Sequence, residues 1–169
     1  MSALLRIAGI AKESIVDGPG IRLTVFTQGC RHNCPGCHNP ETHAFEGGSL
    51  MAVDELGEML KRNPLLDGIT LSGGEPFEQA EALTALAFQA KALGLNVMIY
   101  SGYTYEALLK GAKANPWWGE LLKLADILVD GPFVLSRRSL KLRFRGSANQ
   151  RVIDVKASLE ANETIQLDW

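Results

Sequence analysis

Residues 68–100, GITLSGGEPFEQAEALTALAFQAKALGLNVMIY, predict a strand, a helix and a second strand in succession. We expect the strands at Gly68–Ser72 and Asn96–Tyr100, where the residues are mostly apolar. Between them, Glu78–Leu93 has a single apolar stripe and ends before Gly94, a residue type that commonly stops helices. The stripe consists of Leu83, Leu86, Ala87, Ala90 and Leu93. This order predicts parallel strands joined by a right-handed crossover.

The same alternation continues on both sides of this unit. We expect further strands at Ile21–Gln28, Asp126–Asp130 and Arg151–Val155, and helices at Val53–Arg62, Thr104–Lys113 and Trp117–Leu124. Thr104 is placed to cap its helix. Lys156–Trp169 is expected to form either a strand or a docked tail.

The expected fold is therefore α/β, in one domain over residues 1–169 with a core at 15–155 and a C-terminal tail at 156–169. A closed barrel of eight parallel strands typically needs about 250 residues, more than this chain has. An open, partial β/α barrel of parallel strands is favoured, and a doubly wound sheet is the alternative.

Each of the first four predicted strands runs directly into a glycine-containing loop. The loops are Gln28–Cys30, Ser72–Pro76, Ser101–Thr104 and Asp130–Phe133. In parallel α/β folds, ligands bind at the carboxyl ends of the strands. We therefore expect these loops to meet at one face and form a binding site there.

The composition of the chain argues against two classes of partner, nucleic acids and membranes. The chain has 17 basic and 19 acidic residues, a net charge of −2, which argues against a main role in nucleic-acid binding because phosphate contacts need a surplus of Lys and Arg. No stretch approaches the roughly 20 apolar residues needed to cross a bilayer. The N-terminal residues lack the pattern of a secretion signal. The expected location is the cytoplasm, with no nucleic-acid or membrane partner.

The three cysteines, Cys30, Cys34 and Cys37, lie within one short segment. An odd number so closely spaced does not suit a disulfide scaffold. The thiolates and one of His32, His38 or His43 could form a closed zinc site. Alternatively, three thiolates hold a 4Fe-4S cluster whose fourth iron lacks a protein ligand, because the chain has no fourth cysteine. A bare reactive thiol pair is the third possibility.

The C-x3-C-x2-C spacing after the first predicted strand, with Gly73–Pro76 (GGEP) after the second, resembles the radical S-adenosylmethionine enzymes. Residues 16–22 (VDGPGIR) and 38–42 (HNPET) resemble, more narrowly, the activating enzymes of glycyl-radical enzymes. Residues 129–133 (VDGPF), residues 145–151 (RGSANQR) and the short chain are similar to the subfamily that serves anaerobic ribonucleoside-triphosphate reductases. The resemblance covers about residues 15–155.

This resemblance implies a function and a set of ligand contacts. Cys30, Cys34 and Cys37 would hold a 4Fe-4S cluster, and its open iron would bind the amino and carboxylate groups of S-adenosylmethionine. An electron from a flavodoxin- or ferredoxin-like donor would cleave that ligand, and the resulting 5′-deoxyadenosyl radical would take a hydrogen atom from a glycine of the reductase. S-adenosylmethionine contacts would come from Gly36, Cys37, His38, Gly73, Gly74, Glu75, Ser101 and Asp130.

Several roles within this site have alternatives. Glu75 would support its loop, and a side chain added at Gly74 would occupy space that the ligand needs. Asp130 serves equally well as a turn-former before Gly131. Gly36 stands where most radical S-adenosylmethionine enzymes have an aromatic residue, so packing on the adenine is expected from His38 or Tyr103.

Two alternative functions remain open at this point. The chain could activate another glycyl-radical enzyme, of the pyruvate formate-lyase type, although such activases are generally longer. It could instead be a zinc or electron-transfer module without enzymatic activity. The basic residues Arg137, Arg138, Lys141, Arg143 and Arg145 form either a solvated face or a docking patch for the reductase or the electron donor.

Overall fold

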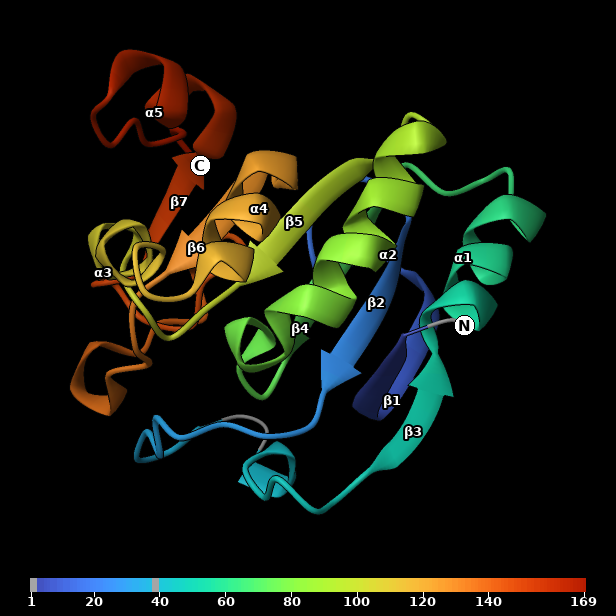
Figure 1. Ribbon diagram of the computed structural model, residues 1–169. Coiled ribbons are helices and arrows are strands. Elements are labelled where there is room, and N and C mark those ends of the chain that lie inside the picture. Colours follow the sequence, from blue (N-terminus) through green and yellow to red (C-terminus); the bar gives the residue numbers. More distant parts are fainter. Residues whose placement is uncertain (1–2, 38–39) are drawn as a thin grey trace.

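The computed structural model describes residues 3–37 and 40–169. Within these residues, seven strands form one open sheet in the order β3-β1-β2-β4-β5-β6-β7 (Figure 1). The strands are β1 (Leu4–Ser14), β2 (Arg22–Thr27), β3 (Ser49–Ala52), β4 (Gly68–Gly73), β5 (Asn96–Tyr100), β6 (Ile127–Asp130) and β7 (Arg151–Asp154). The α/β class is confirmed, whereas the single domain over 1–169 stays a prediction.

The strands run parallel only in the middle of the sheet. Strands β2, β4, β5 and β6 are parallel, and β1, β3 and β7 are antiparallel to their neighbours. The prediction of a wholly parallel sheet is therefore wrong at both edges. Parallel neighbours need a long crossover, usually a helix, whereas β1 and β7 reach their partners through loops, which permits the antiparallel direction.

The helices agree with most of the sequence predictions. They are α1 (Val53–Arg62), α2 (Ala80–Ala92), α3 (Tyr105–Gly111), α4 (Pro116–Leu124) and α5 (Val155–Ala161), with short 3-10 turns at η1 (Pro40–Thr42), η2 (Pro76–Gln79) and η3 (Leu135–Arg137). The predicted span of α1 is confirmed, and Thr104 caps α3 by accepting a hydrogen bond from the Ala107 N–H. No helix among the described residues is long and apolar enough to span a membrane.

Several predicted boundaries are wrong, including the end of α3, which is Gly111 and not Lys113. The helix expected from Glu78 begins at Ala80, because Pro76–Gln79 form the η2 turn first, and Leu93 lies beyond its end, where it is exposed. Lys156–Trp169 were expected to form a strand or a docked tail, but α5 takes up Val155–Ala161. Asp154 starts this helix by accepting a hydrogen bond from the Ala157 N–H. After α5, the Leu167 N–H donates to the Val152 carbonyl, so the last residues do dock on β7.

Successive residues of the central strands point to opposite faces of the sheet, and each face packs into its own cluster. One face packs under α1, α2 and α4, which lie in front of the sheet in Figure 1. This larger core contains strand residues Leu23, Val25, Ile69, Leu71, Val97, Ile99, Leu128 and Ile153. The opposite face buries a smaller cluster of Met98, Ile127, Val129 and Val152, against which Phe144, Leu167 and Trp169 pack. The C-terminal residues thus cover part of the sheet's second face.

Arg22, the first residue of β2, anchors the turn at residues 17–20 from beneath. Its side chain is 1% exposed, and it donates hydrogen bonds to the Pro19 carbonyl and to Thr70 Oγ1. The Thr70 hydroxyl in turn donates to the Asp17 carbonyl. Burial lowers the pKa of the Arg22 guanidinium to about 10, so it keeps its charge at neutral pH. This buried cation fixes the turn against the face of the sheet that carries Met98.

We expect Arg22→Met to lower the free energy of unfolding of the apoprotein by roughly 2–4 kcal/mol, because several buried acceptors lose their donor at once. Urea unfolding followed by circular dichroism measures the change. Arg62→Met, at the exposed end of α1, is the matched control and should change the value by less than about 0.5 kcal/mol. Equal stabilities for the two variants would contradict the anchoring role of Arg22.

Candidate metal centre and ligand cavity

The loops that follow β2, β4, β5 and β6 line one cavity, as their sequence positions predicted. The lining includes two histidines, and two aromatic side chains that the sequence analysis did not select, Tyr100 and Phe133. Of the predicted site residues, those that line it are Cys30, Cys34, Cys37, Gly73, Gly74 and Ser101. Gly36, Glu75 and Asp130 are not among its lining residues, and His38 lies outside the described residues.

Backbone hydrogen bonds hold in place the start of the cysteine loop, which is the segment after β2 that carries Cys30, Cys34 and Cys37. The Gly29 N–H donates to the Thr42 carbonyl, and the Cys30 N–H donates to the His43 carbonyl. All three cysteines are partly buried, no disulfide joins them, and burial raises the pKa of the Cys30 thiol. Among residues 3–37 and 40–169, no three Cys, His, Asp or Glu side chains are placed to share one metal ion. The candidate metal ligands are thus three thiols that open onto a common cavity.

The glycines at the end of β4, Gly73 and Gly74, permit close contact between two backbones. A Cβ atom at Gly74 would lie 2.4 Å from the Gly29 carbonyl oxygen and 2.9 Å from that of Thr42. A side chain at Gly74 would therefore collide with these carbonyls, and the expectation that it also enters ligand space stays a prediction. Gly73 has a φ of +97°, in the region that favours glycine. Gly74 thus lets the β4 loop pack directly against the start of the segment that carries the cysteines, while Gly73 lies against the β2 backbone at Phe26 and Thr27.

Glu75 is fully buried and joins three loops. Its carboxylate accepts hydrogen bonds from the Ser101 hydroxyl and from the N–H groups of Phe77 and Gly102. His32 Nε2, from the cysteine loop, lies 2.6 Å from Glu75 Oε1. The expected role of Glu75 as a support for its loop agrees with these contacts. It acts through other residues, since its side chain does not line the cavity.

A second, larger cavity of about 820 Å³ adjoins the first. The two share Cys37, Ser72, Tyr100, Phe133 and Gln150 as lining residues. The outer walls of the larger cavity come from the turn at Val16 and Asp17 and from the basic segment, through Arg138, Leu140, Phe144 and Arg145. The space beside the cysteines is thus continuous with a wider opening at the protein surface.

Comparison with known proteins agrees with this geometry. Residues 16–153 match a family described as a 4Fe-4S single cluster domain. Anaerobic ribonucleoside-triphosphate reductase-activating proteins from Haemophilus influenzae and Escherichia coli K12 are 33% and 32% identical to this chain over 146 residues. These alignments cover 80% and 82% of the chain, and 89% and 91% of the relatives. The relative from Enterobacteria phage T4 is 31% identical, over 81% of the chain and 86% of its own length.

The chain belongs to the anaerobic ribonucleoside-triphosphate reductase-activating proteins. The resemblance to this subfamily, which residues 129–133 and 145–151 indicated, is thereby confirmed. The description of the matched family supports an iron–sulfur cluster as the cofactor. Within this family, the remaining motif residues can be assigned physical roles from the structure.

The side chain of Asp130, at the end of β6, forms hydrogen bonds with other residues of the chain. Its carboxylate accepts hydrogen bonds from the Tyr105 N–H and, at both oxygens, from the Arg151 guanidinium. Arg151 also pairs with Glu106, and its hydrogen bonds lower the pKa of that carboxyl to about 2. Gly131, the next residue, does line the cavity. Asp130 thus fixes where the β6 loop begins, while its contact with S-adenosylmethionine stays a prediction.

The RGSANQR segment (residues 145–151), for which the sequence offered no physical account, supports the same loop. The Gln150 side-chain amide donates to the Gly131 carbonyl, and that of Asn149 donates to the Pro132 carbonyl. The Ser147 hydroxyl accepts a hydrogen bond from the Val134 N–H. Arg145 donates to the terminal Trp169 carbonyl. These contacts hold residues 131–134 against the cavity from outside.

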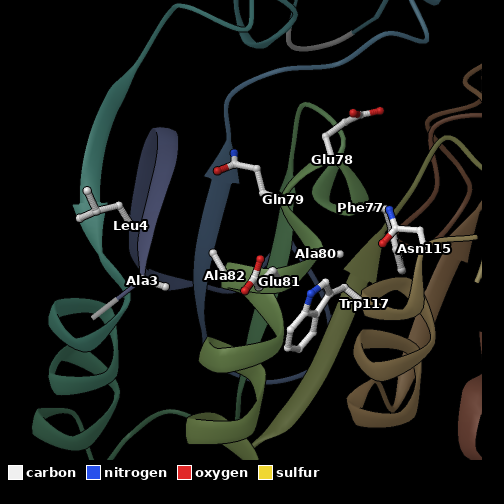
Figure 2. A pocket seen from close by; sticks show the side chains of 10 residues that line it. All are labelled: Ala3, Leu4, Phe77, Glu78, Gln79, Ala80, Glu81, Ala82, Asn115 and Trp117. Carbon is white, nitrogen blue, oxygen red and sulfur yellow. The ribbon is translucent and has the colours of Figure 1, made fainter. Parts of the chain in front are cut away.

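A separate pocket of about 510 Å³ lies at the start of α2, between Leu4 and Trp117 (Figure 2). Its lining includes Glu78 and Glu81, and none of its lining residues is a cysteine or another predicted site residue. The pocket lies next to the GGEP loop. Among the described residues that line this pocket there is no cysteine or histidine, so the cavity beside the cysteines is the candidate active site.

We expect Gly74→Ala to reduce the iron content of the reconstituted protein, because the added methyl group displaces the Gly29 and Thr42 carbonyls that hold the cysteine loop. Iron assay and visible absorbance after anaerobic reconstitution measure this. Gly9→Ala is the control, since a Cβ there meets nothing within 4 Å. Full iron content in Gly74→Ala would show that the contact between the two loops is not needed.

Proposed function

We propose that this chain generates a glycyl radical on an anaerobic ribonucleoside-triphosphate reductase by reductive cleavage of S-adenosylmethionine at a 4Fe-4S cluster. The observation that carries the proposal is the shared cavity, which brings Cys30, Cys34 and Cys37 together with Gly73, Gly74 and Ser101. The names of the relatives support the reductase as target, and the matched family description supports the cluster.

Three cysteine thiolates without a fourth fit a cluster that keeps one iron open. When bound, the cluster supplies a single electron and an open site for the amino and carboxylate groups of S-adenosylmethionine. Overall, one electron, one S-adenosylmethionine and one glycine residue give methionine, 5′-deoxyadenosine and a glycyl radical. The electron would come from a flavodoxin- or ferredoxin-like donor. The protein's task is to bind and orient S-adenosylmethionine and to exclude water from the cavity.

The residues expected to contact S-adenosylmethionine divide this task. Backbone groups of Gly73 and Gly74 would hold the methionine part of the ligand, and Gly36, Cys37 and His38 of the cysteine loop would line it. Ser101 and Asp130 would lie toward the methionine or ribose, with the Ser101 hydroxyl already oriented by Glu75. The adenine would pack on Tyr100 or Phe133, which line the cavity, in preference to Tyr103, whose ring contacts His32 and Trp118 instead.

The reductase would dock over the larger cavity. Arg137, Arg138, Lys141 and Arg143 are exposed around it, and none of them forms an ion pair with the described residues. Leu140, in the middle of this segment, is 95% exposed. Unpaired cations beside an exposed apolar side chain suit an acidic, partly apolar surface. A partner seated there would close the cavity that Cys37 shares with the surface.

The first test of this function is the cofactor. Anaerobically reconstituted protein should hold about four irons and four sulfides per chain, and Cys30→Ala, Cys34→Ala and Cys37→Ala should each lose them, since no other cysteine can substitute. With dithionite and S-adenosylmethionine, the loaded protein should release methionine and 5′-deoxyadenosine in equal amounts. Stoichiometric zinc without iron uptake would contradict the proposal and favour the zinc module.

The second test is the docking surface. Arg138→Glu combined with Lys141→Glu should slow activation of the reductase roughly tenfold at low salt and weaken its dependence on salt, because steering by these cations is lost. The affinity for S-adenosylmethionine should not change. The control reverses Lys110 and Lys113, which are exposed on and just after α3. Equal rates for the two double variants would place the reductase elsewhere on the surface.

A further inference from the structure

The cysteine loop contacts the rest of the cavity through His32, which lies between two of the proposed cluster ligands. Its side chain is 15% exposed, and Nε2 is 2.6 Å from Glu75 Oε1. Because three other donors already point at this carboxylate, Glu75 is the acceptor and the His32 nitrogen is the donor. The contact is therefore a partly buried hydrogen bond between the β2 loop and the β4 loop.

The same carboxylate oxygen extends the connection to the β5 loop. Glu75 Oε1 accepts from the Gly102 N–H at 2.8 Å and from the Ser101 hydroxyl at 2.9 Å. One oxygen atom thus receives hydrogen bonds from His32 and from the two residues that follow β5. Ser101 lines the cavity, and Gly102 lies beside it in the same wall.

The His32 ring also fits tightly against the β5 loop. A Cβ atom at Gly102 would lie 2.5 Å from the ring, so glycine is required there for contact. On its other side, the ring makes an edge contact with Tyr103, with centroids 4.5 Å apart. The neighbouring Arg31 pairs with Glu78, but its side chain is 66% exposed, so this second contact between the loops contributes little.

We propose that His32 is a positioning residue whose hydrogen bond to Glu75 holds the cysteine loop and the Ser101–Gly102 loop in the arrangement that binds S-adenosylmethionine. The inference rests on the proposed function and adds a residue to it. When only a fraction of molecules has the loops together, the apparent affinity for the ligand falls by that fraction. Loss of the bond should therefore weaken ligand binding while the three cysteines still take up iron.

Three variants separate the hydrogen bond from ring packing. His32→Gln keeps a donor near the position of Nε2 and loses the ring. His32→Phe keeps a ring against Gly102 and Tyr103 and loses the donor. Arg31→Gln removes only the exposed contact and serves as the control. Glu75 retains its other donors in every variant, so the fold should persist, which circular dichroism and the unfolding midpoint check.

The first measurement is hydrogen exchange in the apoprotein, which does not depend on S-adenosylmethionine chemistry. The Gly102 N–H, which donates to Glu75, should exchange roughly tenfold faster in His32→Phe, and near the wild-type rate in His32→Gln and Arg31→Gln. The second is calorimetric titration of the cluster-loaded proteins with S-adenosylmethionine, in which the dissociation constant should rise roughly tenfold for His32→Phe alone.

Each result supports or overturns the inference. A wild-type exchange rate for the Gly102 N–H in His32→Phe would show that the hydrogen bond does not position the loop. Equally increased exchange in His32→Gln and His32→Phe would show the same. If exchange changes as expected but wild-type protein with a full cluster binds no S-adenosylmethionine, the proposed function fails, and the positioning role toward that ligand fails with it. Unchanged affinity in His32→Phe, with normal binding by wild type, overturns the inference alone.

Discussion

The buried carboxylate of Glu75 is the contact on which the arrangement of the cavity depends. A carboxylate removed from water is unfavourable unless its oxygens are hydrogen-bonded. Here the donors come from the cysteine loop, from the β5 loop and from the start of its own η2 turn. These hydrogen bonds to Glu75 therefore hold the three segments in fixed positions relative to one another. Glycines at the closest contacts, Gly74 and Gly102, allow the approach.

The sheet makes this convergence possible. Strands β2, β4, β5 and β6 are consecutive neighbours and parallel, so their carboxyl ends lie along one edge. Helices α1, α2 and α4 cover one face, while the Arg22-anchored turn and the C-terminal residues cover parts of the other. The opening left beside the cysteines is bordered by the basic segment, which is where a macromolecular partner has room to approach.

Local patterns were enough to predict much of this fold and site. The alternation of predicted strands and helices gave the span of α1, and glycine-containing loops after four strands indicated the cavity. Strands β1 and β3 were not predicted, although Leu5 and Ile7 alternate with exposed neighbours as an edge-side strand requires. The antiparallel edges depend on pairing between distant segments, which local periodicity does not report. The His32–Glu75 bond and the Asp130–Arg151 pair likewise join residues far apart in sequence.

The central claim is that this chain, with its cluster and S-adenosylmethionine, places a radical on a glycine of the reductase. The most direct measurement is electron paramagnetic resonance after anaerobic incubation of the chain with S-adenosylmethionine, a reductant and the reductase. We predict a stable glycyl radical signal on the reductase that requires every component and is absent with an unrelated glycyl-radical enzyme. No signal from fully loaded protein would contradict the account, and equal activation of the unrelated enzyme would contradict the assigned target.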